Sequence, residues 1–221
     1  MRAAGPTGVY LEVGARRVFA AAVDWPGWCR AGRTEEQALA MLESYAERYS
    51  EVPAQVGVPF PKSLGTAFEV VERLPGDATT DFGAPSRLAA GDSTPLTAVA
   101  AARIAGLIGG CWEVFDRTVA RTPAELRKGP RGGGRDRDKM VDHVLATEAA
   151  YARRLGVRHR PPELGDGVAV KALRHDLLAV LSLASDGTPL VQKGWPVRYA
   201  ARRIAWHILD HAWEMQDRTE R

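Results

Sequence analysis

The C-terminal stretch from Trp195 to Arg221 reads WPVRYAARRIAWHILDHAWEMQDRTER and predicts one long helix. Its apolar residues recur at helical spacing, so one stripe of the helix is expected to face a core. His207 and His211 lie four residues apart and therefore stack on the same face. Burying two imidazoles costs free energy unless they are hydrogen-bonded or bound to a metal. The pair either supplies two ligands for Zn²⁺, Ni²⁺ or Fe²⁺, or consists of two core histidines that are hydrogen-bonded to carbonyl groups.

A third histidine lies in another predicted helix, DKMVDHVLATEAAYARRLG, at residues 138–156. His143 borders the apolar stripe of this helix between Met140 and Thr147, so its side chain is expected to point inward. Alone, it would be read as a hydrogen-bonded core histidine. Together with His207 and His211, it completes a set of three imidazoles that leaves one position open, as in catalytic zinc sites. The sequence HILDH lacks the glutamate of H-E-x-x-H, which argues against a zincin protease.

Composition indicates a globular protein. Of 221 residues, 45% are hydrophobic and 26% charged, and the formal net charge of +3 names no partner. Residues 1–90 hold 9 basic and 11 acidic residues against 21 and 16 in the remainder, which suggests two units. No apolar run approaches about 18 residues, so no membrane span is expected. Because the overall charge is weak, nucleic-acid binding is not expected either. Cys29 and Cys111 form no C-x-x-C pair, and free thiols suit a cytoplasmic protein.

The first part of the chain predicts a small α/β unit at residues 1–75. Residues 8–23 alternate weakly and form a hairpin signal, and Thr34 is a suitable N-cap for an amphipathic helix that extends to about Tyr49. Two further short strands are expected, at residues 56–60 and 67–71. Residues 76–93 are rich in Pro, Gly, Asp, Ser and Thr and are interpreted as a linker.

This front unit resembles the HicB-like antitoxin domain over residues 8–75. The resemblance is carried by the two short strands, the D-W-P-G-W-C loop and the G-R-T-E-E-Q-A-L entry into the helix. It implies a partial RNase H-like fold, a class of domain that usually binds a toxin partner. Because the rest of the chain is different, an antitoxin role does not follow. The unit is interpreted as a structural or lid domain, with ligand or partner binding as the alternative.

Residues 94–221 predict an all-α four-helix bundle, because four amphipathic helical segments follow one another with long connections. The first contains Gly106, Gly109 and Gly110, which permit either close packing or room for a ligand. Between the first two helices lies the basic, glycine-rich stretch RKGPRGGGRDRDK. It is either a solvated loop or a loop that recruits an anion. In the second case Arg131, Arg135 and Arg137 are the candidates for binding an anionic thiol cofactor.

The same region resembles the DinB superfamily of YfiT-like metal-dependent proteins over residues 94–219. The matching residues are His143 in D-H-V-L-A-T-E, and His207 and His211 in W-H-I-L-D-H-A-W-E. The resemblance implies bound Zn²⁺ or Ni²⁺, a homodimer, and chemistry with a low-molecular-weight thiol. Mycothiol-dependent isomerases, bacillithiol transferases and hydrolases that detoxify electrophiles share this fold.

The expected function is therefore that of a metal-dependent hydrolase or of a thiol S-transferase or isomerase. A metal-activated water or a thiol such as mycothiol would attack a reactive electrophilic small molecule. Glu148 and His175 are the candidates for a catalytic base or a residue that supports a ligand. Two alternatives remain. One is a non-catalytic metal-binding module for stress response or self-resistance, and the other is a HicB-like regulatory protein that acts through partners.

Overall fold

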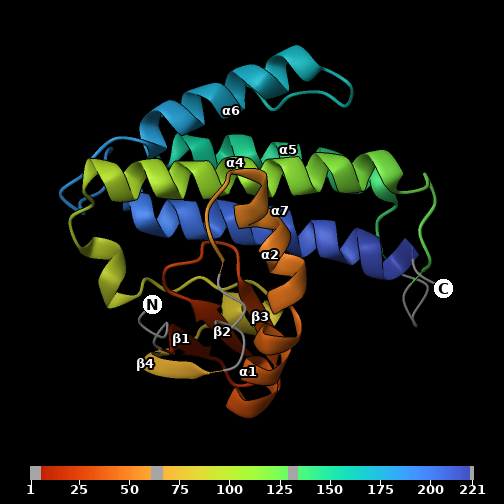
Figure 1. Cartoon of the computed structure of the whole chain (residues 1–221). Helices are drawn as coiled ribbons and strands as arrows, with labels where there is room; N and C mark the ends of the chain where they lie inside the picture. The colour runs from red at the N-terminus through yellow and green to blue at the C-terminus, as the bar shows by residue number, and fades with distance from the viewer. Residues whose placement is uncertain (1–5, 61–66, 129–133, 220–221) are drawn as a thin grey trace.

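A computed structural model describes residues 6–60, 67–128 and 134–219. The protein is a mixed α+β structure, as expected, with a small sheet near the N-terminus followed by a helical region (Figure 1). The sheet half contains β1 (Thr7–Val13), β2 (Val18–Ala22), β3 (Cys29–Gly32), α1 (Glu35–Ser44), α2 (Ala46–Gln55) and β4 (Phe68–Pro75). The rest contains α3 (Ala78–Phe82), η2 (Ala90–Ser93), α4 (Ala98–Arg121), α5 (Arg137–Arg153), α6 (Gly167–Leu181) and α7 (Val197–Thr219).

The four strands lie in the order β3-β2-β1-β4. The predicted hairpin of β1 and β2 is confirmed, and its turn is closed by the Gly14 amide, which donates to the Arg17 carbonyl at 2.9 Å. β2 also pairs antiparallel with β3, whereas β4 pairs parallel with β1. A parallel neighbour needs a crossover connection. Helices α1 and α2 lie on this crossover, between β3 and β4 in the chain.

Three expectations about this half need correction. The predicted single helix is divided at Tyr45 into α1 and α2. The predicted strand at 56–60 is wrong, because the chain leaves α2 through Gly57, which has a φ of 65°, and forms no strand there. Phe60 instead packs its ring against Trp25, with centroids 4.8 Å apart. The short strand β3 was not expected, whereas the strand predicted at 67–71 is confirmed as β4.

The segment at residues 76–93, interpreted from its composition as a linker, is structured. It contains α3 and η2, and it is held to the sheet by Glu12, a fully buried residue of β1. The Glu12 carboxylate accepts hydrogen bonds from the backbone amides of Ser86 at 2.9 Å and Arg87 at 3.0 Å, and from the Thr80 hydroxyl at 2.5 Å. A buried carboxylate satisfied in this way fixes the connecting segment in place.

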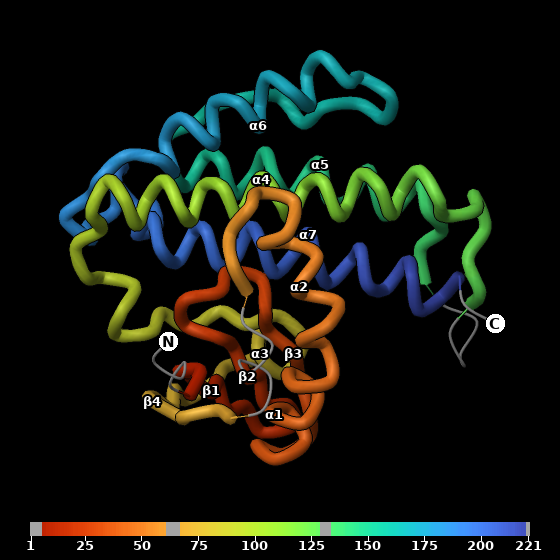
Figure 2. The backbone as a smooth tube through the Cα atoms, in the orientation of Figure 1, coloured from red at the N-terminus to blue at the C-terminus, as the bar shows by residue number. Residues whose placement is uncertain are grey.

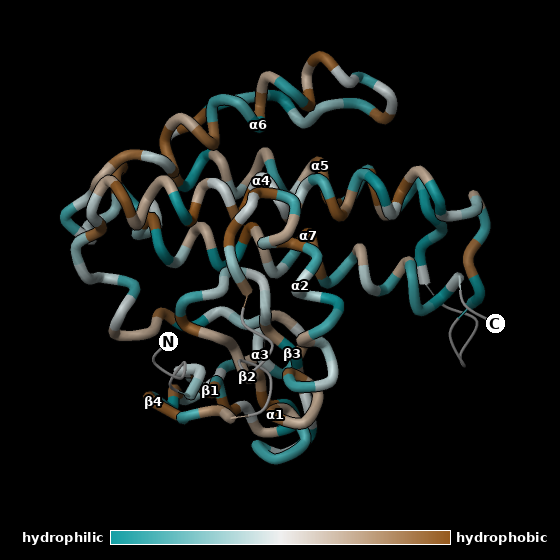
Figure 3. The backbone as a smooth tube through the Cα atoms, in the orientation of Figure 1, coloured by the Kyte–Doolittle hydropathy of each residue, from teal (hydrophilic) through white to brown (hydrophobic). Residues whose placement is uncertain are grey.

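The four long helices of the second half are all present, as expected. Figure 2 shows α4 and α7 running side by side in the same direction, with α5 and α6 following on the far side from the sheet. Figure 3 shows hydrophobic and hydrophilic residues recurring along each helix, as amphipathic helices require. Among the described residues, α4 is the one helix long and apolar enough to cross a membrane. Its Leu107, Ile108 and Phe115 are buried, so α4 is a core helix of the bundle.

The two halves share one hydrophobic core. Gly27, in the loop before β3, lies directly against α7, where an added Cβ would meet Leu209 at 2.7 Å. Trp206 of α7 contacts Phe19 of β2 edge-on, and the Arg30 guanidinium forms an ion pair with Asp210 at 3.0 Å. Helix α7 is therefore packed by the sheet half on one side and by the other bundle helices on the other.

Candidate metal centre

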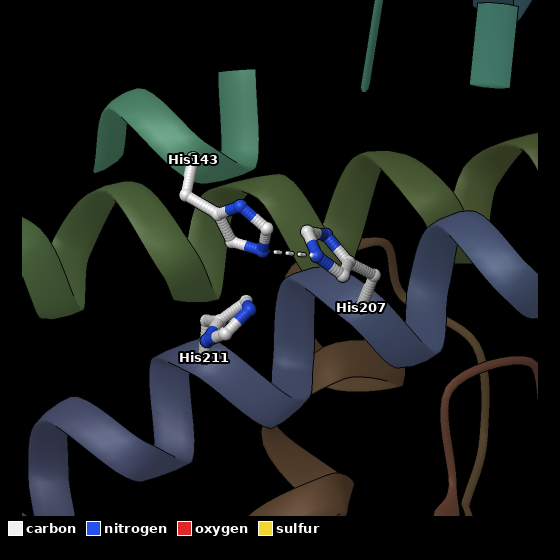
Figure 4. A group of neighbouring side chains, drawn as sticks. All are labelled: His143, His207 and His211. Carbon is white, nitrogen blue, oxygen red and sulfur yellow. Dashed lines mark hydrogen bonds between the residues drawn. The ribbon is translucent and has the colours of Figure 1, made fainter. Parts of the chain in front are cut away.

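Three histidine side chains converge between two helices of the bundle (Figure 4). His207 and His211 come from one face of α7, because residues four apart stack on an α-helix. His143 reaches them from α5, which packs against α7. The Nε2 atoms of His143 and His207 are 3.1 Å apart, and the potential ligand atoms of all three residues lie within 4.8 Å of one another. The structure thus brings together the three residues that the sequence singled out.

The spacing suits a divalent ion. Zinc binds imidazole nitrogen at about 2.0–2.1 Å, so two nitrogens of a tetrahedral site lie roughly 3.4 Å apart. The Nε2 atoms of His143 and His207 are already near this separation. The rings of His207 and His211 are nearly perpendicular, with centroids 4.7 Å apart, and each lies 5.0 Å from the ring of His143. Small side-chain rotations would place one nitrogen of each ring around a common centre.

The surroundings favour the neutral imidazole, which is the form that binds metal. His207 is 6% exposed, and burial is the main reason that its pKa lies well below its ordinary value, with His211 and His143 lowering it further. Burial likewise lowers the pKa of His143, followed by the effects of His211 and Arg135. A lowered pKa at His143 and His207 means that these two imidazoles present lone pairs rather than positive charges to an arriving cation.

Glu214 orients one of the ligands, and sequence reasoning missed it. Its Oε2 lies 3.2 Å from His211 Nδ1, and its Oε1 accepts a hydrogen bond from Arg218. The contact with His211 is the main reason that the pKa of Glu214 is lowered. A carboxylate on Nδ1 keeps the proton there and leaves Nε2 free for a metal, as in many zinc sites. The i, i+3 spacing in HAWE was the available signal.

His207 has no such support. Its Nδ1 is buried and has no hydrogen-bond partner within the part of the chain that the structure describes. Its ring is instead positioned by packing, with the ring of Tyr151 5.8 Å away and that of Trp206 6.1 Å away. The site therefore combines one ligand fixed by a carboxylate with one fixed by its aromatic neighbours.

His143 connects the cluster to solvent. It lines an open cavity of about 650 Å³, together with Asp142 on its own helix and residues 161–164 of the loop before α6. This loop contributes two prolines, Leu164 and the carboxylate of Glu163. A small molecule can therefore reach the His143 side of the cluster, across a partly apolar rim that carries two acidic groups.

The two residues predicted as catalytic lie elsewhere. Glu148 is 1% exposed, and it accepts a hydrogen bond from Trp112 Nε1 at 2.7 Å and one from Arg174 Nε at 3.4 Å. Burial raises the pKa of Glu148, and the charge of Arg174 opposes this. Its carboxylate thus joins α4, α5 and α6. His175 is exposed on α6. Neither belongs to the histidine cluster, and their catalytic role stays a prediction.

The three arginines predicted to bind a cofactor have different environments. Arg131 lies outside the described residues. Arg137 donates to Asp138 at 2.7 Å and to the Thr122 carbonyl at 3.0 Å, so it anchors the start of α5. Arg135 is exposed, and its charge contributes to lowering the pKa of both His143 and His207. Of the two described arginines of this set, Arg135 is the one whose charge acts on the histidines.

Comparison with known proteins identified no similar protein. No protein-family model, no curated protein and no solved structure matches the chain. What the fold and the site define is a mixed α+β protein whose helical half carries a candidate centre of three histidines, open to solvent on one side.

Proposed function

We propose that the protein binds one divalent metal ion through His143, His207 and His211 and acts as a metal-dependent enzyme. The observation that carries this is the convergence of three imidazoles from α5 and α7, within 4.8 Å of one another. Three histidine ligands with an open fourth position favour Zn²⁺, with Ni²⁺ or Fe²⁺ as alternatives. The reaction class is hydrolysis, thiol transfer or isomerisation of a reactive electrophilic small molecule.

When bound, such an ion supplies Lewis acidity that activates water or a low-molecular-weight thiol such as mycothiol. The chain holds the three nitrogens in place, and Glu214 keeps the proton of His211 on Nδ1. In the transfer reaction the thiol sulfur would bond to the electrophilic carbon, the bond to the leaving group would break with its electrons on that group, and the thiol proton would pass through water to the leaving group. Arg135, whose charge acts on both His143 and His207, would attract an anionic group of the thiol cofactor or substrate, and the cavity beside His143 would be its route of entry past the two acidic groups of the rim.

The finer fold assignment belongs to the same proposal. A DinB-like bundle is supported by four long helices that carry histidines on the second and the fourth. A HicB-like front domain is supported by the β3-β2-β1-β4 order with β4 parallel to β1. A homodimer and a cytoplasmic location go with this assignment. The two free, buried cysteines are compatible with a reducing compartment.

The first test is metal content by plasma mass spectrometry on tag-free protein. The chain offers its own controls, because His159 and His175 lie outside the cluster. We expect about one ion per chain in the wild type, in His159→Ala and in His175→Ala, and a loss of the ion in His207→Ala. The absence of metal from wild-type protein after reconstitution with Zn²⁺, Ni²⁺ and Fe²⁺ would rule out the centre.

A second candidate function is a non-catalytic metal-binding module. It is favoured by the position of Glu148, whose carboxylate is engaged by Trp112 and Arg174 and does not face the histidines as a base would. A thiol-consumption assay with a panel of electrophiles separates the two. Turnover that requires the ion supports the enzyme. Stoichiometric metal without turnover of any electrophile, with or without thiol, supports the module.

A further inference from the structure

A second cavity, of about 970 Å³, lies away from the histidines. It is formed by the sheet half, η2 and the first turns of α4 and α7, and none of the three histidines lines it. In Figure 2 the segment that contains η2 passes between the sheet and the left-hand ends of these two helices. Ligand sites are typically concave and mostly apolar, with a few placed polar groups. The lining of this cavity likewise combines apolar side chains with a few charged ones.

Two arginines in the lining, Arg103 and Arg198, donate to backbone carbonyls and form no ion pair with a carboxylate among the described residues. Arg103 of α4 donates to the Asp24 carbonyl at 2.8 Å, and its guanidinium lies 4.5 Å from the centre of the Trp25 ring. Arg198 of α7 donates to the Pro95 carbonyl at 3.2 Å, and its Nε is buried without a partner among the described residues. Carbonyl groups and an aromatic ring position a guanidinium without cancelling its charge.

The third arginine of the lining is different. Arg202 is paired with Asp92 and also donates to the Tyr10 hydroxyl, so its charge is compensated. Of the other two acids, Glu72 is partly buried and accepts from the Ala90 amide at 3.0 Å, so it keeps its negative charge, whereas Asp24 is exposed. Exposed charges are screened by solvent more strongly than partly buried ones.

The ends of the two helices add to the positive character. Both α4 and α7 begin at this cavity, and neither has an acidic residue in its first turn. The N-terminus of a helix carries partial positive charge and favours anions. The two helix ends therefore add to the positive field of Arg103 and Arg198, which the carboxylate of Glu72 opposes from the sheet side.

The remaining lining is apolar. Trp25 and Ile104 form part of it, and Val71 and Val23 lie beside them although they are 56% and 40% exposed. Two exposed valines next to a buried indole offer area that an apolar group would remove from water. We propose that this cavity binds a small organic anion, a carboxylate, phosphate or sulfonate joined to an apolar group, with its charge near Arg103 and Arg198.

The probe for the test is anilinonaphthalene sulfonate, which joins one negative charge to an apolar ring system, and its uncharged parent N-phenylnaphthylamine is the comparison. Fluorescence titration of the full chain should give one saturable site for the sulfonate and at least tenfold weaker binding of the parent. Arg103→Met with Arg198→Met keeps most of the apolar bulk and should weaken the sulfonate about tenfold. The variant should leave the parent unchanged.

A second pair of variants avoids dependence on the arginine variant's folding. Val71→Glu adds a negative charge at the cavity and should weaken the sulfonate but not the parent. Val168→Glu is the matched control, because Val168 is 81% exposed on α6 and does not line the cavity. Equal affinity of wild type for the two probes, or equal sulfonate affinity in Val71→Glu and Val168→Glu, would overturn the proposal.

Discussion

The Nε2 atoms of His143 and His207 lie 3.1 Å apart although 64 residues separate them in the chain. Such proximity arises only because α5 and α7 pack with these positions facing each other. Two neutral imidazoles at this distance share one N–H, or they share a cation. Addition of zinc distinguishes these two states.

Addition of Zn²⁺ to metal-free protein should raise the melting temperature by about 5 °C or more. An ion at 100 times its Kd stabilises a protein by about 2.7 kcal/mol, and in chains of this size each kcal/mol corresponds to roughly 2–4 °C. Differential scanning fluorimetry with and without a chelator measures the shift. His159→Ala should respond like wild type and His143→Ala should not. The same shift in both variants would place the ion elsewhere.

Replacement of Glu148 should affect stability rather than metal binding. Glu148→Ala leaves Arg174 buried without its inner carboxylate, and breaking a buried ion pair costs about 3 kcal/mol. Glu148→Leu with Arg174→Met removes both charges and should recover most of this loss. Urea denaturation and zinc stoichiometry provide the two readouts. Unchanged stability with lost turnover would instead establish the catalytic role predicted from the sequence.

The glycines of α4 should respond to alanine in opposite directions. A Cβ at Gly110 would lie 2.5 Å from the Val52 carbonyl oxygen of α2, whereas Gly106 and Gly109 have nothing within 4 Å. Gly106→Ala and Gly109→Ala should each stabilise the protein by up to about 1 kcal/mol through helix propensity. Gly110→Ala should destabilise it, because backbone atoms must separate. Urea midpoints that move in the same direction for all three would contradict this packing.

Neither cysteine should react in the native protein. Burial, assisted by Glu12, raises the pKa of Cys29 to about 12 against the opposing effect of Arg30, and burial also raises the pKa of Cys111. The thiolate is the reactive form, so a raised pKa lowers the reactive fraction at every pH below it. Mass spectrometry after iodoacetamide treatment at pH 8 should show no label in the native state and two labels in guanidinium chloride. Native labelling of Cys29 would indicate that its loop opens.

The two halves should unfold together. They share a core, and removal of residues 1–93 would expose Leu209, Trp206 and Trp213 of α7. We expect coincident transitions by circular dichroism and tryptophan fluorescence for the whole chain, and an aggregating or molten fragment for residues 94–221. A soluble fragment with a sharp thermal transition would show that the bundle folds independently.

Much of the histidine cluster could be predicted from sequence because helical periodicity places side chains on faces. The i, i+4 spacing fixed His207 relative to His211, and the stripe of the second bundle helix directed His143 inward. Helical periodicity carries no information about which side chains of a neighbouring helix a residue contacts. The engagement of Glu148 by Trp112 and Arg174 depends on two other helices, so no local pattern could reveal it.

In the sheet half, local signals predicted the hairpin and β4 but not β3. Four residues after a tight turn carry almost no alternation, and β3 exists because β2 offers it a partner. Composition also misled at residues 76–93, where Gly, Pro and Asp suggested a free linker. Those residues cap α3 and donate backbone amides to the buried Glu12, a long-range contact that composition cannot encode.

Helix α7 has packed neighbours on both sides, and this determines whether the metal site forms before or during metal binding. In zinc fingers the ligands are scattered along an unfolded chain, and the metal supplies the free energy of folding. Here the carrier helix is already held by the sheet half and by α4, and the imidazoles already face one another. The ion would then bind to a preformed site. Its binding and release would depend on the concentration of free metal and not on folding of the chain.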